Sequence, residues 1–301
     1  MAGDSWISAI LDFIRKLFGI GKTSAGGNVP TGTGTPPVEE VPAVMNRKVM
    51  VINFLPPAAV AKGWFDPEVL ITQYIAKMKE LSNDLLVYEV VSQQEVAAYP
   101  LLEGNRRYDD ATWTRALVDP TQRYYRPNTH PPQLATIDYP RLIQDYQLLS
   151  QVQSGAVDEV WLFGGPYFGF QESLMAGRGA FPCNGPFVEA DSPRFVIMGF
   201  SYEREMKLMV HDYGHRMESI LSRKFNTLYV TNFYAPKLPD DAPLPPAGQF
   251  PAPQNAFEQF LLDHGTVHRR PGGANYSQDE YVWLSAVPRE WWPATIDPNR
   301  V

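Results

Sequence analysis

Residues 157–186 read VDEVWLFGGPYFGFQESLMAGRGAFPCNGP, and residues 194–219 read RFVIMGFSYEREMKLMVHDYGHRMES. Each stretch contains a short apolar run, VWLF at 160–163 and FVIM at 195–198, which ends in glycine and leads into sequence that is compatible with a helix. Buried parallel strands enter their crossover helices in this way. We therefore expect two neighbouring parallel strands here, with polar residues gathered just past the carboxyl end of each.

The sequence on either side repeats this alternation of strand and helix. Strands are predicted at 48–54, 85–91, 158–163 and 194–200, and helices at 66–81, 138–154, 202–222 and about 255–263. Two further candidates are a short helix at 92–98 and a fifth strand at 227–232. The alternation predicts an α/β fold, a layered and mostly parallel central sheet with flanking helices. The 28 prolines predict long Pro-rich loops between these elements.

The composition limits the classes of protein to which the chain can belong. It has 301 residues, of which 44% are hydrophobic and 20% are charged, so it can bury one sizeable core. The net charge is −7, which gives no basic surface for nucleic acid, and we set nucleic-acid binding aside. A single cysteine, Cys183, excludes an intramolecular disulfide and any cysteine-rich metal site.

The N-terminus predicts a separate segment. In residues 5–21, SWISAILDFIRKLFGIG, apolar residues recur three and four positions apart and charged residues lie on the opposite face, which is typical of an amphipathic helix. We therefore divide the chain into three parts. They are an amphipathic docking or targeting helix at 1–20, a flexible Gly/Thr/Pro linker at 21–44, and a single α/β domain at 45–301 with a loop-rich C-terminal part.

The apolar face of this helix needs a partner, and three alternatives stay open. The helix packs on its own domain, docks to a protein partner or larger assembly, or lies on a membrane surface. It is too short and too charged to span a bilayer, and it lacks the basic start and uninterrupted apolar core of a secretory signal. The sequence is therefore compatible with a cytoplasmic protein, one carried by a larger assembly, or one at the periphery of a membrane.

Glycines and polar residues follow the two apolar runs. In an open α/β sheet, the loops that leave the carboxyl ends of the strands form the crevice where ligands bind. The glycines after the first run permit a tight turn and close backbone approach, and residues 171–173 come at the start of a possible helix. A purely structural turn is the alternative. The candidate ligand-binding residues are Gly164, Gly165, Tyr167, Asn184, Tyr202 and Arg204.

Four of the five histidines come in pairs spaced four apart, His211 with His215 and His264 with His268. On a helix this spacing places two imidazoles on one face, as zinc enzymes commonly do. The candidate metal ligands are His211, His215 and His268, and a divalent metal such as zinc is the candidate cofactor. The alternative is that these histidines lie on a helix surface or are hydrogen-bonded without a metal.

Three carboxylates and one thiol complete the candidate catalytic set. Glu172 paired with Glu203 or Glu218 would suit acid and base roles, and the alternative is that these carboxylates are solvated or salt-bridged. Cys183 is either a thiolate nucleophile beside an imidazole or a small buried hydrophobe. His215 is the most versatile candidate, because it can ligate a metal, activate a thiol or transfer a proton.

The segments DEVWLFGGPYFGFQESLMAG, AFPCNGP, RFVIMGFSYERE and YGHRMES resemble a family of bacterial proteins, often predicted to be extracellular, that carry DEVWxxGGPYFG-like and YGHRxES-like blocks. The resemblance covers roughly residues 45–290 and includes HGTVHRRP at 264–271. The family has no established activity, so the resemblance implies a shared site without implying its chemistry. Its second block includes His215 and leaves out His211, which favours His215 acting with His268 or Glu172.

These interpretations lead to one main expectation and two alternatives. The main expectation is a hydrolase-like enzyme for a small-molecule or polymer substrate, with a metal-assisted version. In it, His215 is the base or a ligand and the three glutamates act in support. The first alternative is a non-catalytic binding or cargo protein, docked to a larger assembly or a membrane surface through residues 5–21. The second is a thiol enzyme that uses Cys183.

Overall fold

The computed structural model describes residues 40–227, 253–267 and 280–301. By its contacts the chain divides into two units, Met1–Glu40 and Val41–Val301, and all elements described below belong to the second. The predicted N-terminal helix at 1–20 and most of the predicted linker at 21–44 lie outside the described residues, so both stay predictions.

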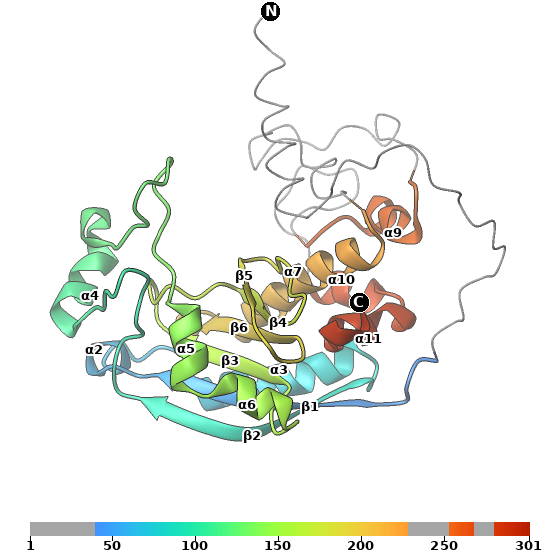
Figure 1. Ribbon diagram of the computed structural model, residues 1–301, viewed down its shortest axis with the longest axis horizontal. Helices are drawn as coiled ribbons and strands as arrows, with labels where there is room; N and C mark the ends of the chain where they lie inside the picture. The colour runs from blue at the N-terminus through green and yellow to red at the C-terminus, as the bar shows by residue number, and fades with distance from the viewer. Residues whose placement is uncertain (1–39, 228–252, 268–279) are drawn as a thin grey trace, which may run out of the picture. The chain divides into compact units, whose positions relative to one another are not determined.

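A six-stranded sheet in the order β2-β1-β3-β6-β4-β5 organises the described residues (Figure 1). The first four strands in this order are mutually parallel, and β4 is antiparallel to β6, so the predicted α/β fold with a mostly parallel sheet is confirmed. The strands are β1 (Met45–Phe54), β2 (Leu86–Val96), β3 (Glu159–Gly164), β4 (Ser173–Gly177), β5 (Phe187–Glu189) and β6 (Phe195–Ser201).

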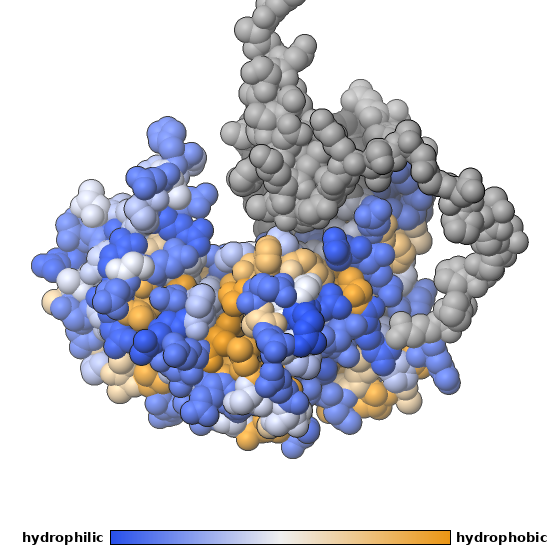
Figure 2. Space-filling view, in the orientation of Figure 1, coloured by the Kyte–Doolittle hydropathy of each residue, from blue (hydrophilic) through white to orange (hydrophobic). Residues whose placement is uncertain are grey.

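Helices cover both faces of this sheet. Helices α5 and α6 lie on one side, whereas α3 and α7 pack against each other on the other side (Figure 1). The helices are α2 (Pro57–Val60), α3 (Pro67–Leu81), α4 (Asp110–Val118), α5 (Tyr139–Asp145), α6 (Leu148–Gln153), α7 (Met206–Lys224), α9 (Ala256–His264), α10 (Glu280–Ala286) and α11 (Trp292–Ile296). Hydrophilic residues cover most of the face shown in Figure 2, with apolar residues visible in its middle. Within the described residues, no helix is long and apolar enough to cross a membrane.

The two strands predicted to be neighbours are neighbours. β3 pairs with β6 in parallel, with Phe163 opposite Phe200 and Gly164 opposite Ser201, and every residue of β3 is buried. Continuous apolar runs are what a strand covered on both faces requires. The carboxyl ends of these strands therefore open at one edge of the sheet, where the site was expected.

The predicted helix start at 171–173 is wrong, because β4 begins at Ser173 and runs antiparallel to β6 with all of its residues buried. The short helix predicted at 92–98 is also wrong. β2 continues to Val96 and pairs with β1 as far as Phe54, and its polar residues are tolerated because β2 lies at the sheet's edge.

Two predicted helices have different limits in the structure. The single helix predicted at 138–154 is broken at Gln147, whose left-handed φ of 51° separates α5 from α6. Helix α7 begins at Met206, so residues 202–204, which were predicted to be helical, lie in the turn before it. The helix predicted near 255–263 is confirmed as α9. Of the strand proposed at 227–232, Thr227 is not in a strand and residues 228–232 lie outside the described residues.

Helix α7 is anchored to the sheet by a buried ion pair. Arg216 Nη1 lies 2.7 Å from Glu159 Oε2 of β3, and the two side chains are 0% and 1% exposed. The same guanidinium donates to the carbonyl oxygens of Thr295 and Ile296 in α11, at 3.1 and 3.2 Å. A buried charge is stable only when it is paired and hydrogen-bonded in this way. The ion pair therefore fixes how α7 is rotated about its own axis.

Candidate functional site

Two imidazoles of α7 meet at their Nε2 atoms. The Nε2 atoms of His211 and His215 are 3.0 Å apart, as the spacing of four predicts for one helix face. His211 Nδ1 lies 3.1 Å from Glu280 Oε1 of α10, and His215 Nδ1 lies 3.0 Å from Glu218 Oε2. Each imidazole is therefore oriented from behind by its own carboxylate.

This arrangement favours one tautomer of each ring. A proton on each Nδ1 would be donated to the carboxylate behind it, and a neutral ring in that tautomer presents an Nε2 lone pair. Two lone pairs that face each other at this distance repel, unless a proton or a metal cation offsets the repulsion. The pair is therefore suited to hold either a shared proton or a metal ion.

Their surroundings shift the pKa values of the two imidazoles in opposite directions. Burial lowers the pKa of His211, and the neighbouring His215 lowers it further. Burial also acts to lower the pKa of His215, but the hydrogen bond and charge of Glu218, together with Glu172, outweigh burial and raise it. Without a metal, the first proton to bind the pair therefore resides mainly on His215.

The carboxylates behind the imidazoles come from different parts of the chain. Glu218 Oε1 accepts the backbone N–H of Val267 at 2.9 Å, so it joins α7 to the segment that follows α9. Gly214 allows this contact, because a Cβ there would lie 2.8 Å from Val267 Cγ2. Glu280 also forms an ion pair with Lys207 at 3.2 Å. Tertiary contacts from two elements thus orient the imidazole pair.

Among residues 40–227, 253–267 and 280–301, no three His, Cys, Asp or Glu side chains come together as a metal-binding group. The third predicted ligand, His268, lies outside the described residues, so the predicted triad stays a prediction. The described part of the chain contributes two imidazoles to the candidate metal site, and this brings His211 into the site although the resemblance favoured His215 acting with His268 or Glu172.

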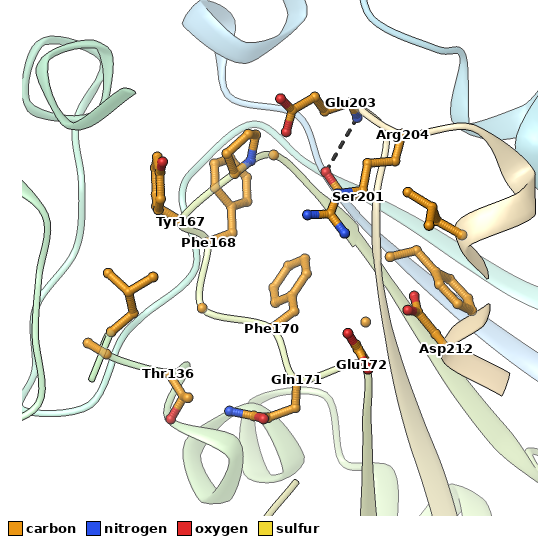
Figure 3. A pocket seen from close by; sticks show the side chains of 18 of the residues that line it. Thr136, Tyr167, Phe168, Phe170, Gln171, Glu172, Ser201, Glu203, Arg204 and Asp212 are labelled. Carbon is orange, nitrogen blue, oxygen red and sulfur yellow. Dashed lines mark hydrogen bonds between the residues drawn. The ribbon is translucent and has the colours of Figure 1, made fainter. Parts of the chain in front are cut away.

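A cavity of about 580 Å³ lies at the carboxyl ends of β3 and β6 (Figure 3). Its walls come from residues 165–172, from the turn after β6 and from the first turns of α7. A further wall comes from residues 108–136, an aromatic loop that contains α4. Of the predicted site residues, the cavity is lined by Gly165, Tyr167, Glu172, Glu203 and Arg204. The location predicted for the pocket is therefore where the cavity lies.

The turn after β3 has a strained backbone conformation. Tyr167, on the cavity wall, has a left-handed φ of 65°, which is uncommon for a residue with a side chain. Trp113 of α4 donates its indole N–H to the Pro166 carbonyl oxygen at 2.9 Å, and the Arg123 guanidinium lies 4.2 Å from the centre of the Tyr167 ring. The aromatic loop therefore fixes the turn, as is common where backbone strain is part of a functional site.

Two carboxyl groups share one end of the cavity, and the sequence analysis missed one of them. Asp212 is 8% exposed, and its carboxyl group makes no hydrogen bond to any described residue. Burial raises its pKa well above the usual range, Glu172 raises it further, and Arg204 acts in the opposite direction. Figure 3 shows Glu172 and Asp212 on the same side of the cavity. The sequence signal that could have found it is its position, three residues after Met209 and four before Arg216, on the buried side of α7.

Glu172 connects the cavity with the imidazole pair. Its backbone carbonyl accepts the Gly199 N–H at 3.2 Å, which places it beside the carboxyl end of β6. Its carboxylate accepts a hydrogen bond from the Asn184 side chain, whose backbone N–H donates to Ser219 of α7 at 3.2 Å. Its charge raises the pKa of His215. The cavity and the imidazole pair are therefore neighbouring parts of one region.

The chain matches no known protein-family model, and no curated protein or solved structure is significantly similar to it. The geometry of the described residues therefore carries the functional argument.

Three of the predicted site residues, Gly164, Cys183 and Tyr202, are buried and do not line the cavity. Cys183 is 0% exposed, and burial raises the pKa of its thiol to about 11, so it packs as a small hydrophobe and is not placed to act as a nucleophile. Tyr202 is buried, and its hydroxyl donates to the Phe54 carbonyl oxygen at 3.1 Å, which makes it a structural residue. Gly164 is buried in β3 and does not line the cavity.

Proposed function

We propose that this protein is a hydrolase that uses a divalent metal, with His211 and His215 as two of the metal ligands. The observation that carries the proposal is the 3.0 Å approach of the two Nε2 atoms, with a carboxylate on each Nδ1. Metal-ligating histidines almost always donate their other ring N–H to a carboxylate, carbonyl or water, which fixes the tautomer that binds metal.

The donor set favours zinc over magnesium or calcium, because imidazole suits zinc whereas the lighter cations prefer oxygen ligands. A Zn–N bond is about 2.0–2.1 Å, so two nitrogens on a tetrahedral zinc lie about 3.3 Å apart. The imidazoles need to separate by only a few tenths of an ångström to match this spacing. His268 is the proposed third protein ligand, and catalytic zinc sites keep a further position for water.

When bound, such a metal makes water acidic enough to react near neutral pH and polarises the bond that is cleaved. The roles of the protein's own groups follow from their positions. Glu172, between the imidazoles and the cavity, is the proposed base that takes a proton from the attacking water and returns it to the leaving group. Glu218 and Glu280 hold the imidazoles in the tautomer that binds metal. The cavity orients the substrate beside Glu172.

The test is the metal content and hydrolytic activity of the purified protein. We expect about one zinc per chain in the natural protein and a large loss of zinc in His211→Ala, His215→Ala and His268→Ala. The control is His130→Ala, which alters an exposed loop residue. Activity on chromogenic ester, phosphodiester and amide substrates should fall at least 100-fold in His215→Ala and remain in the control.

The opposite result would leave a shared proton between the imidazoles. In that case all four variants and the natural protein would contain equally little metal, and added zinc would not change hydrolysis. This outcome would overturn the proposal, because the close approach of the Nε2 atoms would then be explained without a metal.

The binding or cargo alternative depends on residues 5–21, which lie outside the described residues. Docking of this segment to a protein assembly or a membrane surface therefore stays a prediction. Unchanged localisation and partner recovery after deletion of residues 1–43 would leave the prediction without support.

A further inference from the structure

We propose that the cavity at the carboxyl ends of β3 and β6 binds an organic ammonium group, with Asp212 and Glu172 as its acceptors. As a statement about the substrate, this inference rests on the proposed function. As a statement about binding, it rests on the cavity alone.

Asp212 is buried without a hydrogen-bond donor to its carboxyl group. It is 8% exposed and lines the cavity, and its carboxyl oxygens accept no hydrogen bond from a described residue. Burying a carboxylate without a donor is costly, so such groups are usually paired. The ion pair of Arg216 with Glu159 shows how this fold satisfies a buried carboxylate that has only a structural role. The corresponding donor for Asp212 is thus expected from a ligand.

The cavity wall contains more acidic than basic side chains. Four carboxylates line it, Glu172, Glu203, Glu205 and Asp212, against the single guanidinium of Arg204. Glu203 and Glu205 are exposed at the rim, whereas Glu172 and Asp212 lie deeper. Burial and Glu172 favour the neutral form of Asp212 in the free protein, whereas a positive group between Asp212 and Glu172 removes their mutual repulsion and stabilises both as carboxylates. The wall therefore favours a cation over an anion.

The aromatic part of the cavity wall favours an organic cation over a metal ion. Aromatic side chains form much of the remaining wall, namely Tyr108, Tyr124, Tyr167, Phe168 and Phe170. Aromatic faces attract ammonium groups and pack against the carbon skeleton that carries them. Around Asp212, the described residues offer no third acidic or imidazole ligand of the kind a metal would need. An ammonium, with three N–H donors for two carboxylates, fits the same place.

The experiment uses three probes of similar shape and different charge. They are 2-phenylethylamine as its ammonium, neutral 2-phenylethanol and anionic phenylacetate, measured by isothermal titration calorimetry on the full chain. We expect the ammonium to bind at least tenfold more tightly than the alcohol, and phenylacetate to bind most weakly. Equal binding of the alcohol, or tighter binding of phenylacetate, would overturn the inference.

Variants then assign the binding to the two carboxylates. Asp212→Asn and Glu172→Gln should each weaken ammonium binding at least tenfold. Asp145→Asn removes the same charge from the exposed Arg141–Asp145 pair on α5, and it should leave binding unchanged within about twofold. Melting curves show whether each variant is folded, and if Asp212→Asn does not fold, Glu172→Gln decides. Equal affinities in the cavity variants and the control would overturn the inference.

The outcomes of the two proposals are separable. Ammonium binding is measured with and without a chelator and in His215→Ala, where the proposed metal site is lost. Binding that persists in a protein without zinc or hydrolytic activity supports the ammonium site and contradicts the metal hydrolase. Zinc-dependent hydrolysis without a preference for the ammonium probe supports the hydrolase and contradicts the ammonium site.

Discussion

Replacing Arg216 by Met should destabilise the protein by about 6 kcal/mol. The variant removes the positive partner of Glu159, and an uncompensated buried charge costs about 3–5 kcal/mol. It also leaves the carbonyl oxygens of Thr295 and Ile296 without their guanidinium donor, at about 1 kcal/mol each. Since domains are stable by only about 5–15 kcal/mol, this loss is severe. In a domain of this size it corresponds to a fall in Tm of about 10–20 °C.

A double-mutant cycle with Glu159→Gln isolates the ion pair from the other losses. Glutamine keeps an acceptor for the Trp161 indole N–H, which lies 2.8 Å from Glu159 Oε1, and it removes the charge. The double variant then buries no ion, so we expect it to be more stable than Arg216→Met by about 2–3 kcal/mol. Urea unfolding at neutral pH, followed by circular dichroism, measures each corner of the cycle. Additive losses, or a Tm for Arg216→Met within 3 °C of the natural protein, would refute the reasoning.

Three further predictions test other parts of the structure. Because burial raises the pKa of Cys183 to about 11, the protonated thiol stabilises the fold below pH 9, and about 3 kcal/mol is lost as the pH rises from 9 to 11. Cys183→Ser should flatten this part of the urea-stability profile, and iodoacetamide should modify the natural protein at pH 8 only after unfolding. Gly214→Ala should destabilise by about 1 kcal/mol in the same assay, because overpacking against Val267 outweighs the better helix propensity of alanine; a more stable variant would contradict this. Trp113→Phe removes the indole N–H that donates to the Pro166 carbonyl oxygen. It should lower the free energy of unfolding by about 1 kcal/mol and weaken probe binding in the cavity. Unchanged binding would show that the turn does not need this hydrogen bond.

The sequence predicted those parts of the fold in which the apolar pattern is continuous. β3 and β6 are buried on both faces, so their continuous apolar runs can be recognised as strands without knowing which strands they pair with. β4 was missed because it is short and follows the polar residues Gln171 and Glu172, and its antiparallel pairing depends on β6. The break between α5 and α6 depends on the left-handed backbone of Gln147, for which the sequence has no glycine signal.

In the candidate site too, local relations could be predicted from the sequence and tertiary contacts could not. The spacing of His211 and His215 placed them on one helix face, because that relation is local. Glu280 was missed because it reaches His211 from 69 positions away, across a contact between two helices. Asp212 was missed because an aspartate next to a histidine looks like a solvated helix residue until the helix is docked. What the sequence could not supply was therefore the docking of α7.

The docking of α7 links stability to the site through helix geometry. His211 and His215 form one stripe along α7, and Asp212 and Arg216 form a second stripe one residue further on, which is about 100° around the helix axis. The second stripe is buried, with Arg216 held by Glu159 at one end and Asp212 facing the cavity at the other. Turning α7 by one position would move Arg216 away from Glu159 and His211 away from Glu280. The ion pair thus fixes the rotation at which His211 meets Glu280 and Glu218 meets the Val267 N–H, and loss of Arg216 should lower zinc content even where the variant remains folded.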